Sequence, residues 1–153
     1  MRRTDREITN FNEIIDILNR AATLRLGIQG EEYPYVVPLC FGVKVEKEQV
    51  TIYAHGAKDG LKSTLLARNN NVCIEADIFH KYLQTERGFT ALYESVIGFG
   101  TAETVTGSEA EAGMDSILTH CGFQNAPYDK SALEKITILK ITLTKLTGKR
   151  HTI

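Results

Sequence analysis

The stretch from Ile52 to Asn69, IYAHGAKDGLKSTLLARN, holds the residues best suited to bind a charged ligand. It reads as a strand, a glycine-rich turn and a helix whose first turn carries Lys62, Ser63 and Thr64. A helix N-terminus exposes unsatisfied N–H groups and partial positive charge, so this turn suits a phosphate monoester. The alternative is that Lys58 and Lys62 are ordinary solvated residues, because a lysine often follows a strand–turn–helix junction.

His55 ends the strand before this turn and adjoins Gly56. In a functional interpretation its imidazole faces the ligand as a hydrogen-bond donor or general acid. Alternatively, it is a structural or solvent-facing histidine. The other histidines share no metal-ligand spacing with it, and no metal site is expected; they are His80, His120 and His151.

Composition places limits on the class of protein. The chain has 153 residues, with 18 Lys and Arg against 19 Asp and Glu, so one domain over residues 1–153 is expected and no basic excess favours nucleic acid. No apolar stretch is long enough to span a bilayer, and the N-terminus does not read as a secretory signal. The three widely spaced cysteines, with Cys40 and Cys73 in apolar runs, predict buried reduced thiols in a cytoplasmic protein.

The hydrophobic periodicity predicts a mainly β, α+β domain of about six strands and two or three helices. Strands are predicted at 24–28, 35–45, 49–55, 71–78, 92–106 and 136–146. Helices are predicted at 10–21, 61–69 and from Ser108, which with Glu111 forms a capping box, and residues 131–135 form one helical turn. Residues 79–91 read as a polar loop. Short turns between consecutive strands favour antiparallel pairing, in a barrel or an α+β sheet.

Pro38 interrupts the predicted strand 35–45 and must lie at an edge, a bulge or a break. The interruption leaves the N–H groups of Val37 and Leu39 free to bind something other than a strand. Gly98-Phe99-Gly100 lacks the third glycine of a dinucleotide fingerprint, so it predicts a bend or a close backbone approach. There is also no G-x-S-x-G elbow, Walker loop or H-E-x-x-H motif.

In the order and spacing of its motifs the chain resembles the pyridoxamine 5′-phosphate oxidase-related flavoproteins, specifically the nitroimidazole-resistance branch. The motifs are Met1-Arg-Arg-Thr-Asp-Arg-Glu-Ile-Thr, Tyr35-Val-Val-Pro-Leu-Cys-Phe-Gly, Ile52-Tyr-Ala-His-Gly-Ala-Lys-Asp-Gly-Leu-Lys, Val72-Cys-Ile-Glu-Ala-Asp, Tyr93-Glu-Ser-Val-Ile-Gly-Phe-Gly-Thr-Ala and Leu146-Thr-Gly-Lys-Arg. Two positions depart from the family pattern. Asn70 stands where proline is common, and Glu94 where a basic residue is common.

The resemblance implies a split β-barrel and a homodimer with one FMN at each of two subunit-interface sites. It implies that the isoalloxazine ring is lined by Val37, Pro38 and Leu39, and that Tyr53, Ala54 and His55 follow the ribityl chain and ring edge. Lys62, Gly60 and Ser63 would hold the phosphate, while Ser95 and Val96 of the other subunit, with Arg150 of the terminal Gly148-Lys149-Arg150, would close the site.

The function implied is an oxidoreductase that passes electrons from a reduced nicotinamide or another donor through FMN to a small acceptor such as a nitro-aromatic. His55 would donate a proton to the reduced acceptor. Pyridoxamine phosphate oxidation itself is not expected, because the extended C-terminal substrate segment is lacking. Two alternatives remain open: a non-catalytic flavin- or haem-binding protein with His55 as axial ligand, and a structural protein with an unoccupied pocket.

Overall fold

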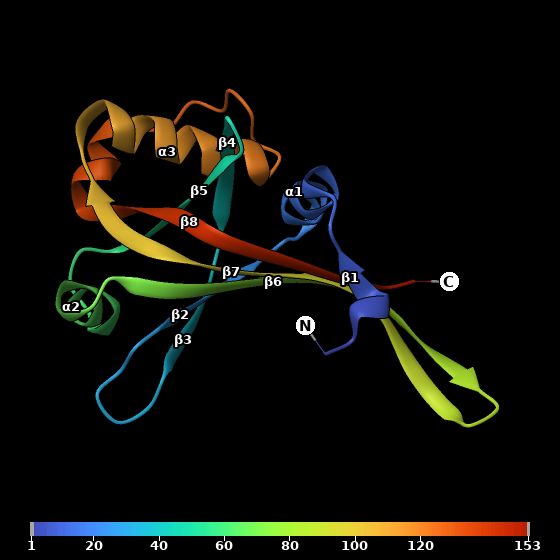
Figure 1. Cartoon of the computed structure of the whole chain (residues 1–153). Helices are drawn as coiled ribbons and strands as arrows, with labels where there is room; N and C mark the ends of the chain where they lie inside the picture. Colours follow the sequence, from blue (N-terminus) through green and yellow to red (C-terminus); the bar gives the residue numbers. More distant parts are fainter. Residues whose placement is uncertain (1, 153) are drawn as a thin grey trace.

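The structure is a computed structural model, and it describes residues 2–152. Its strands form one antiparallel sheet in the order β3-β2-β6-β7-β8-β5-β4, with β1 paired to β8 (Figure 1). The strands are β1 (Glu7–Ile8), β2 (Leu24–Ile28), β3 (Tyr35–Leu39), β4 (Phe41–Glu46), β5 (Gln49–Ala57), β6 (Asn71–Thr85), β7 (Gly88–Val105) and β8 (Ile136–His151). The predicted mainly antiparallel fold is confirmed.

The sheet curls into an open, split barrel. Strands β3 and β4 stand at opposite ends of the strand order, yet only Cys40 separates them in the chain. The sheet must therefore curl until its two ends approach each other. The single strand predicted over residues 35–45 breaks at this point into two, and Pro38 lies in edge strand β3, where its missing N–H costs no ladder bond.

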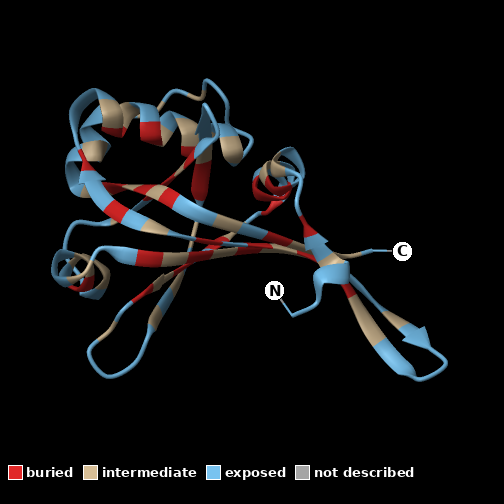
Figure 2. Cartoon of the chain, viewed as in Figure 1, coloured by how far each residue is buried: buried red, intermediate tan, exposed pale blue. Residues whose placement is uncertain are grey.

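Helix α1 (Phe11–Arg20) covers the inner face of the sheet, as its periodicity predicts. Asn10 caps it, because its side-chain oxygen accepts hydrogen bonds from the N–H groups of Asn12 and Glu13. Ile17 and Leu18 are fully buried in the main core, which the sheet and α1 enclose (Figure 2).

Helix α3 (Gly107–His120) lies on the other side of β5 and encloses a second, smaller core (Figure 1). The predicted capping box at Ser108 is wrong. Thr106 is the N-cap without a side-chain hydrogen bond, and Gly107, with a φ of 60°, turns the chain into the helix one residue early.

The predicted loop over residues 79–91 is also wrong. Strands β6 and β7 continue through it and form a hairpin arm, residues 79–91, which projects from the barrel (Figure 1). The ring of Tyr82 packs against Phe79 at 4.9 Å and against Phe89 at 6.1 Å between centroids. The pairing of these aromatic side chains holds the arm together, although its polar residues conceal the strand pattern in the sequence.

Helix α2 (Leu61–Arg68) forms where predicted, and two 3₁₀ helices cover Thr4–Arg6 and Lys130–Lys135. The final strand extends five residues beyond the predicted end at Leu146. Burial of the thiols is not confirmed, since Cys40 and Cys121 are exposed and Cys73 is half-buried. Within residues 2–152, the structure has no helix long and apolar enough to cross a membrane.

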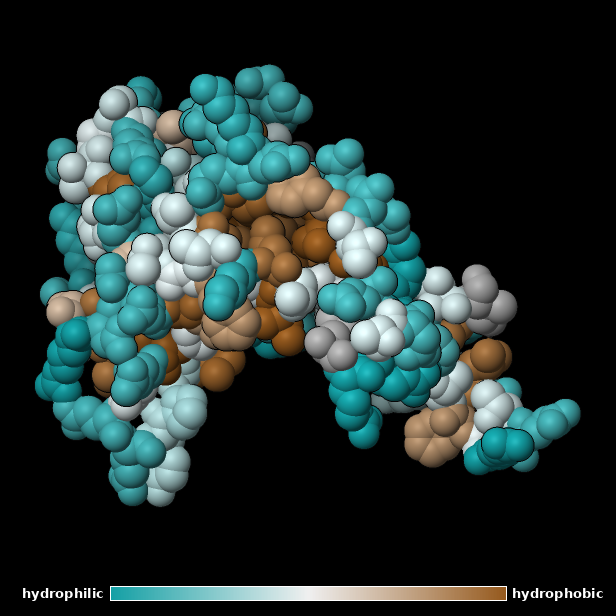
Figure 3. Space-filling model, viewed as in Figure 1, coloured by the Kyte–Doolittle hydropathy of each residue, from teal (hydrophilic) through white to brown (hydrophobic). Residues whose placement is uncertain are grey.

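The surface combines polar helices with an apolar hollow. Figure 3 shows apolar side chains gathered at the centre of one face, below α3 and beside α1. This apolar hollow therefore lies between α1 and α3, the helices that pack on the main core and on the second core.

Candidate cofactor-binding site

The turn between β5 and α2 presents an open helix N-terminus. Gly60 is the N-cap of α2, with a φ of 144° and no side-chain cap. Thr64 donates two hydrogen bonds to the Gly60 carbonyl, from its N–H at 3.1 Å and its hydroxyl at 3.2 Å. The N–H groups of residues 61–63 lie in the first turn and lack intrahelical acceptors, so they are free to bind an anion.

Lys62 is a half-buried cation at this N-terminus. Its ammonium donates to the carbonyl oxygen of His55 at 3.4 Å, and among residues 2–152 it forms no ion pair. Burial lowers the pKa of Lys62 because the charged form loses hydration. The ammonium lies against Gly56, where an added Cβ would be 2.0 Å from Nζ. We call the space around the Lys62 ammonium, which the missing side chain of Gly56 leaves open, the Lys62 cradle. A partly desolvated cation in this space is suited to bind a phosphate.

His55 lies at the same turn with an exposed side chain. Partial burial lowers the pKa of His55, and the nearby Lys62 ammonium lowers it further. The imidazole is therefore neutral at pH 7, with one donor and one acceptor nitrogen for a ligand.

Strand β3 supplies an apolar wall beside the turn. Val37 and Leu39 pack against the main core, while Pro38 is exposed on the outer face. The β2–β3 loop and α2 enclose a hollow of about 420 Å³, whose lining includes Tyr35, Leu61 and Thr64. An edge strand, an apolar hollow and a phosphate-type turn are thus adjacent.

Thr64 and Ser63, the two hydroxyl-bearing residues at the start of α2, line two different hollows. Ser63 lines a different one, of about 490 Å³, together with Lys58 and the ends of β7 and β8. Of the residues predicted to hold phosphate, Lys62 and Gly60 have the better placement around the cradle, and Ser63 can contribute its backbone N–H.

Three predicted ligand residues have side chains that point into the protein. Tyr53 is buried under α3, where a Cβ at Gly113 would be 2.7 Å from its ring. Ala54 and Val96 are completely buried, Val96 as part of the main core. Only their main-chain atoms can contact a cofactor, which the alternation of neighbouring strand positions could have indicated.

Ser95 lies far from the turn within one chain. It pairs with Lys149 of β8, whereas His55 pairs with Ile138 of the same strand. Eleven residues of strand separate these positions by roughly 35 Å along β8. The predicted site residues therefore form two groups that one chain does not bring together.

Arg150 does not share the face of Ser95. Its Nε donates to Glu94 at 2.7 Å, and its Nη1 donates to Glu13. Glu94 is buried on the α1 side of the sheet, where it also accepts from Arg20 at 2.9 Å. The preceding residue, Lys149, pairs with Ser95 and faces the same way, so within the predicted segment Gly148-Lys149-Arg150 the lysine, and not Arg150, lies on that face.

The arrangement suits a cofactor with a phosphate and a flat apolar ring. Lys62 and the open N-terminus of α2 supply positive charge and fixed donors, and β3 supplies the apolar edge. Among the described residues no three His, Cys, Asp or Glu side chains are grouped to hold a metal ion.

Comparison with known proteins adds a family and a fold. A family model described as pyridoxamine 5′-phosphate oxidase matches residues 11–150. No curated protein matches the chain. A Bacteroides thetaiotaomicron protein assigned to 5-nitroimidazole antibiotic resistance has a similar structure, with a TM-score of 0.83 and 30% identity over 94% of this chain and 85% of that chain.

Two more distant structures share the fold alone. A flavocytochrome from Azotobacter vinelandii has a TM-score of 0.81 at 16% identity, covering 100% of this chain and 72% of its own. An FAD and haem binding protein from Mycobacterium smegmatis has a TM-score of 0.77 at 15% identity, covering 97% of this chain and 74% of its own.

Proposed function

Because this chain belongs to the pyridoxamine 5′-phosphate oxidase family, we propose that it is an FMN-binding oxidoreductase. It passes electrons from a reduced nicotinamide or another donor to a small acceptor such as a nitro-aromatic. One observation carries the proposal: the Lys62 ammonium is half-buried beside an open helix N-terminus and forms no ion pair among the described residues. Similarity to a protein assigned to nitroimidazole resistance supports the choice of acceptor.

The phosphate of FMN is held by Lys62 and by the N–H groups at the start of α2. Val37, Pro38 and Leu39 of the edge strand provide the surface for the isoalloxazine ring, and the main chain at residues 53–55 follows the ribityl chain. Bound FMN supplies two-electron transfer. The neutral imidazole of His55 positions an N–H donor at the ring edge for the acceptor's oxygen.

A second copy of the chain completes the site. Ser95 is roughly 35 Å from His55 along β8, so it reaches a flavin only if another subunit supplies it. The proposed functional unit is therefore a homodimer with one FMN at each of two equivalent interface sites, as expected for a two-fold assembly.

The absorption spectrum of the protein as purified tests this proposal. We expect a yellow protein with about one FMN per chain, bleached by NADH or NADPH without oxygen and re-oxidised by a nitro-aromatic. The number of FMN per chain follows from the one Lys62 cradle in each copy. A colourless protein that takes up no added FMN would contradict it.

Haem binding on the same scaffold is the second candidate. The exposed and neutral imidazole of His55 favours it, because a neutral histidine nitrogen is an axial ligand of haem iron. A red-brown protein whose spectrum changes in a His55→Ala variant would establish haem in place of FMN.

A further inference from the structure

A second cationic cluster lies at the opposite end of the sheet, on the face of Ser95. Tyr93 and Lys149 are the outward-facing neighbours of Ser95 on β7 and β8. The Lys149 ammonium is 5.5 Å from the centroid of the Tyr93 ring, and Arg6 also approaches the phenol oxygen. Burial acts to raise the pKa of Tyr93, but hydrogen bonds and charges from Lys149 and Arg6 outweigh it and lower the pKa overall.

Arg6 has few partners for its charge. One guanidinium nitrogen donates to Nε2 of His151 at 3.3 Å, and Nε is buried without a hydrogen-bond partner among the described atoms. His151 holds its Nδ1 at 2.8 Å from the carbonyl oxygen of Ala91, so that nitrogen carries the proton and Nε2 accepts from Arg6. A histidine supplies no negative charge to compensate the cation.

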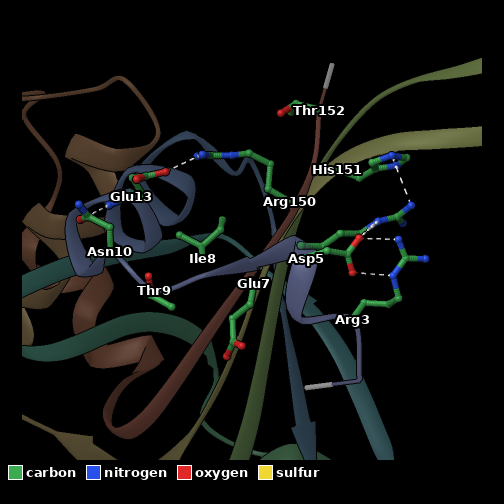
Figure 4. Close-up of a pocket in the computed structure, with 11 residues that line it drawn as sticks. Arg3, Asp5, Glu7, Ile8, Thr9, Asn10, Glu13, Arg150, His151 and Thr152 are labelled. Carbon is green, nitrogen blue, oxygen red and sulfur yellow. Dashed lines mark hydrogen bonds and ion pairs between the residues drawn. The ribbon is translucent and has the colours of Figure 1, made fainter.

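Asp5, the carboxylate next to Arg6 in the chain, is already paired with Arg3. Asp5 accepts two hydrogen bonds from Arg3, at 2.7 and 2.6 Å, whereas its distance to Arg6 Nε is 4.0 Å. The hydrogen bond from Arg3 lowers the pKa of Asp5 to about 2. Figure 4 shows Arg3, Asp5 and His151 together at one end of a hollow of about 400 Å³, with the Glu13–Arg150 pair at the other.

Lys149 forms no ion pair within residues 2–152, although Glu7 is its cross-strand neighbour on β1. The cluster therefore holds two cations, Arg6 and Lys149, that no carboxylate contacts at hydrogen-bonding distance in the part of the chain described. The phenol of Tyr93, which both cations approach, adds a further hydrogen-bond donor. These are the groups that recognise a carboxylate or phosphate oxygen.

We propose that Arg6, Tyr93 and Lys149 form a binding site for an oxyanion carried by a reactant of the flavin. This inference rests on the proposed function, because Ser95 reaches the partner's flavin only in the dimer. Tyr93 is two residues from Ser95, about 7 Å along β7, so the cluster flanks the place where a reactant approaches the ring. The site selects anionic acceptors, such as nitrobenzoates, or holds a phosphate of the nicotinamide donor.

Matched ligands that differ only in charge test the site. Calorimetry on the protein as purified measures the dissociation constants of 4-nitrobenzoate and neutral 4-nitrobenzamide, for wild type, Lys149→Met, Arg6→Gln and Tyr93→Phe. Lys149→Met and Arg6→Gln are expected to weaken 4-nitrobenzoate binding about tenfold and to leave 4-nitrobenzamide within twofold. Lys135→Met, which removes an exposed lysine at the end of the second 3₁₀ helix, changes neither.

The same variants separate the sources of the oxyanion. A rise in KM for NADPH, with 4-nitrobenzoate binding unchanged, would assign the site to the donor and support the proposal. Equal loss of both nitro ligands, or no change for any reactant, would overturn it. FMN content and sedimentation are measured on every variant. An FMN-free wild type contradicts the proposed function, whereas retained FMN without charge discrimination contradicts this inference alone.

Discussion

Lys62 is the residue whose environment a bound phosphate would change most. Burial destabilises the charged ammonium, and no counter-charge compensates it among the described residues. Burial is accordingly the cause that lowers the pKa of Lys62. The buried charge therefore lowers the folding stability as long as the lysine is charged. This destabilisation disappears as the pH rises through the lowered pKa toward 10.5. A dianionic ligand removes that destabilisation at neutral pH.

Replacing Lys62 by methionine is expected to weaken FMN binding about ten- to a hundredfold, since one charge-assisted hydrogen bond is lost. The FMN-free protein should unfold at the same temperature as wild type or slightly higher, because an unpaired half-buried charge is removed. Fluorescence titration with FMN and thermal unfolding measure the two effects. Lys58→Met, at an exposed position of the same turn, is the control, and equal FMN affinity in both variants would place the phosphate elsewhere.

Glu94 is the buried carboxylate that ties β7 to its surroundings. It accepts from Arg20 and Arg150, and His80 approaches it at 3.3 Å. Burial acts to raise the pKa of Glu94, but the two arginines outweigh it and lower the pKa below 4.5. Its stabilisation is therefore complete above the unfolded pKa of about 4.5, and it is lost as the pH falls through the lower folded value.

A Glu94→Gln variant is expected to lose about 2–3 kcal/mol of unfolding free energy at pH 7, because both charge-assisted hydrogen bonds are weakened. Urea unfolding at pH 7 and at pH 3 measures the loss, which should be smaller at pH 3. Asp16→Asn is the control, since Asp16 pairs with Arg20 at an exposed position. A loss that grows as the pH falls would be inconsistent with the lowered pKa.

At the scale of elements, glycines set how closely strands and helices approach. A Cβ at Gly42 of β4 would be 2.4 Å from Ser116 of α3, in contact with both its backbone and its hydroxyl. The helix backbone cannot move aside without disturbing the second core. By contrast, a Cβ at Gly27 of β2 would meet its nearest atom at 3.4 Å, an ordinary contact.

Gly42→Ala is therefore expected to lower the unfolding free energy by about 1–3 kcal/mol, the usual cost of overpacking. Gly27→Ala should remain within about 0.5 kcal/mol of wild type. Urea unfolding, with the same denaturant slope in both variants, measures the difference. Similar stabilities for the two would show that α3 does not pack on β4 at this distance.

At the scale of the whole molecule, exposed apolar side chains follow the outer face of the sheet and the arm. Val36, Ile97 and Phe99 lie on the sheet and are 59%, 40% and 49% exposed. On the arm, Tyr82 and Phe89 are 69% and 78% exposed. A projecting two-stranded hairpin with exposed aromatic rings is marginal in water by itself, so these surfaces are expected to be covered in the proposed dimer.

Phe89→Ser is expected to weaken the dimer at least tenfold without lowering the helix and strand content, because burial of an aromatic ring is lost at the interface only. Sedimentation over a range of concentrations and circular dichroism measure the two effects. Phe123→Ser removes another exposed ring, which follows α3, and should leave the dimer intact. A wild type that sediments as a monomer would contradict the dimer itself.

The amino-acid sequence was sufficient to predict the antiparallel class and the helices around Ile14, Leu65 and Ile117, because periodicity and turn residues act locally. The order of its motifs, by resemblance, indicated the family. The sequence also predicted Lys62 as a phosphate contact, because the strand–turn–helix junction that carries it is continuous in the chain. Local patterns could not reveal the hairpin arm, whose polar strands are held by cross-strand pairing.

The face that each strand residue occupies, and the pairs of charged side chains that meet, became known from the three-dimensional structure. The side chains of Tyr53 and Val96 turn into the two cores, and Arg150 is bound to Glu94 and Glu13 while Lys149 takes the outer face. Arg6 meets His151 although 145 positions separate them. Such pairings depend on strand register and the curl of the sheet, which long-range packing sets and no local pattern of residues specifies.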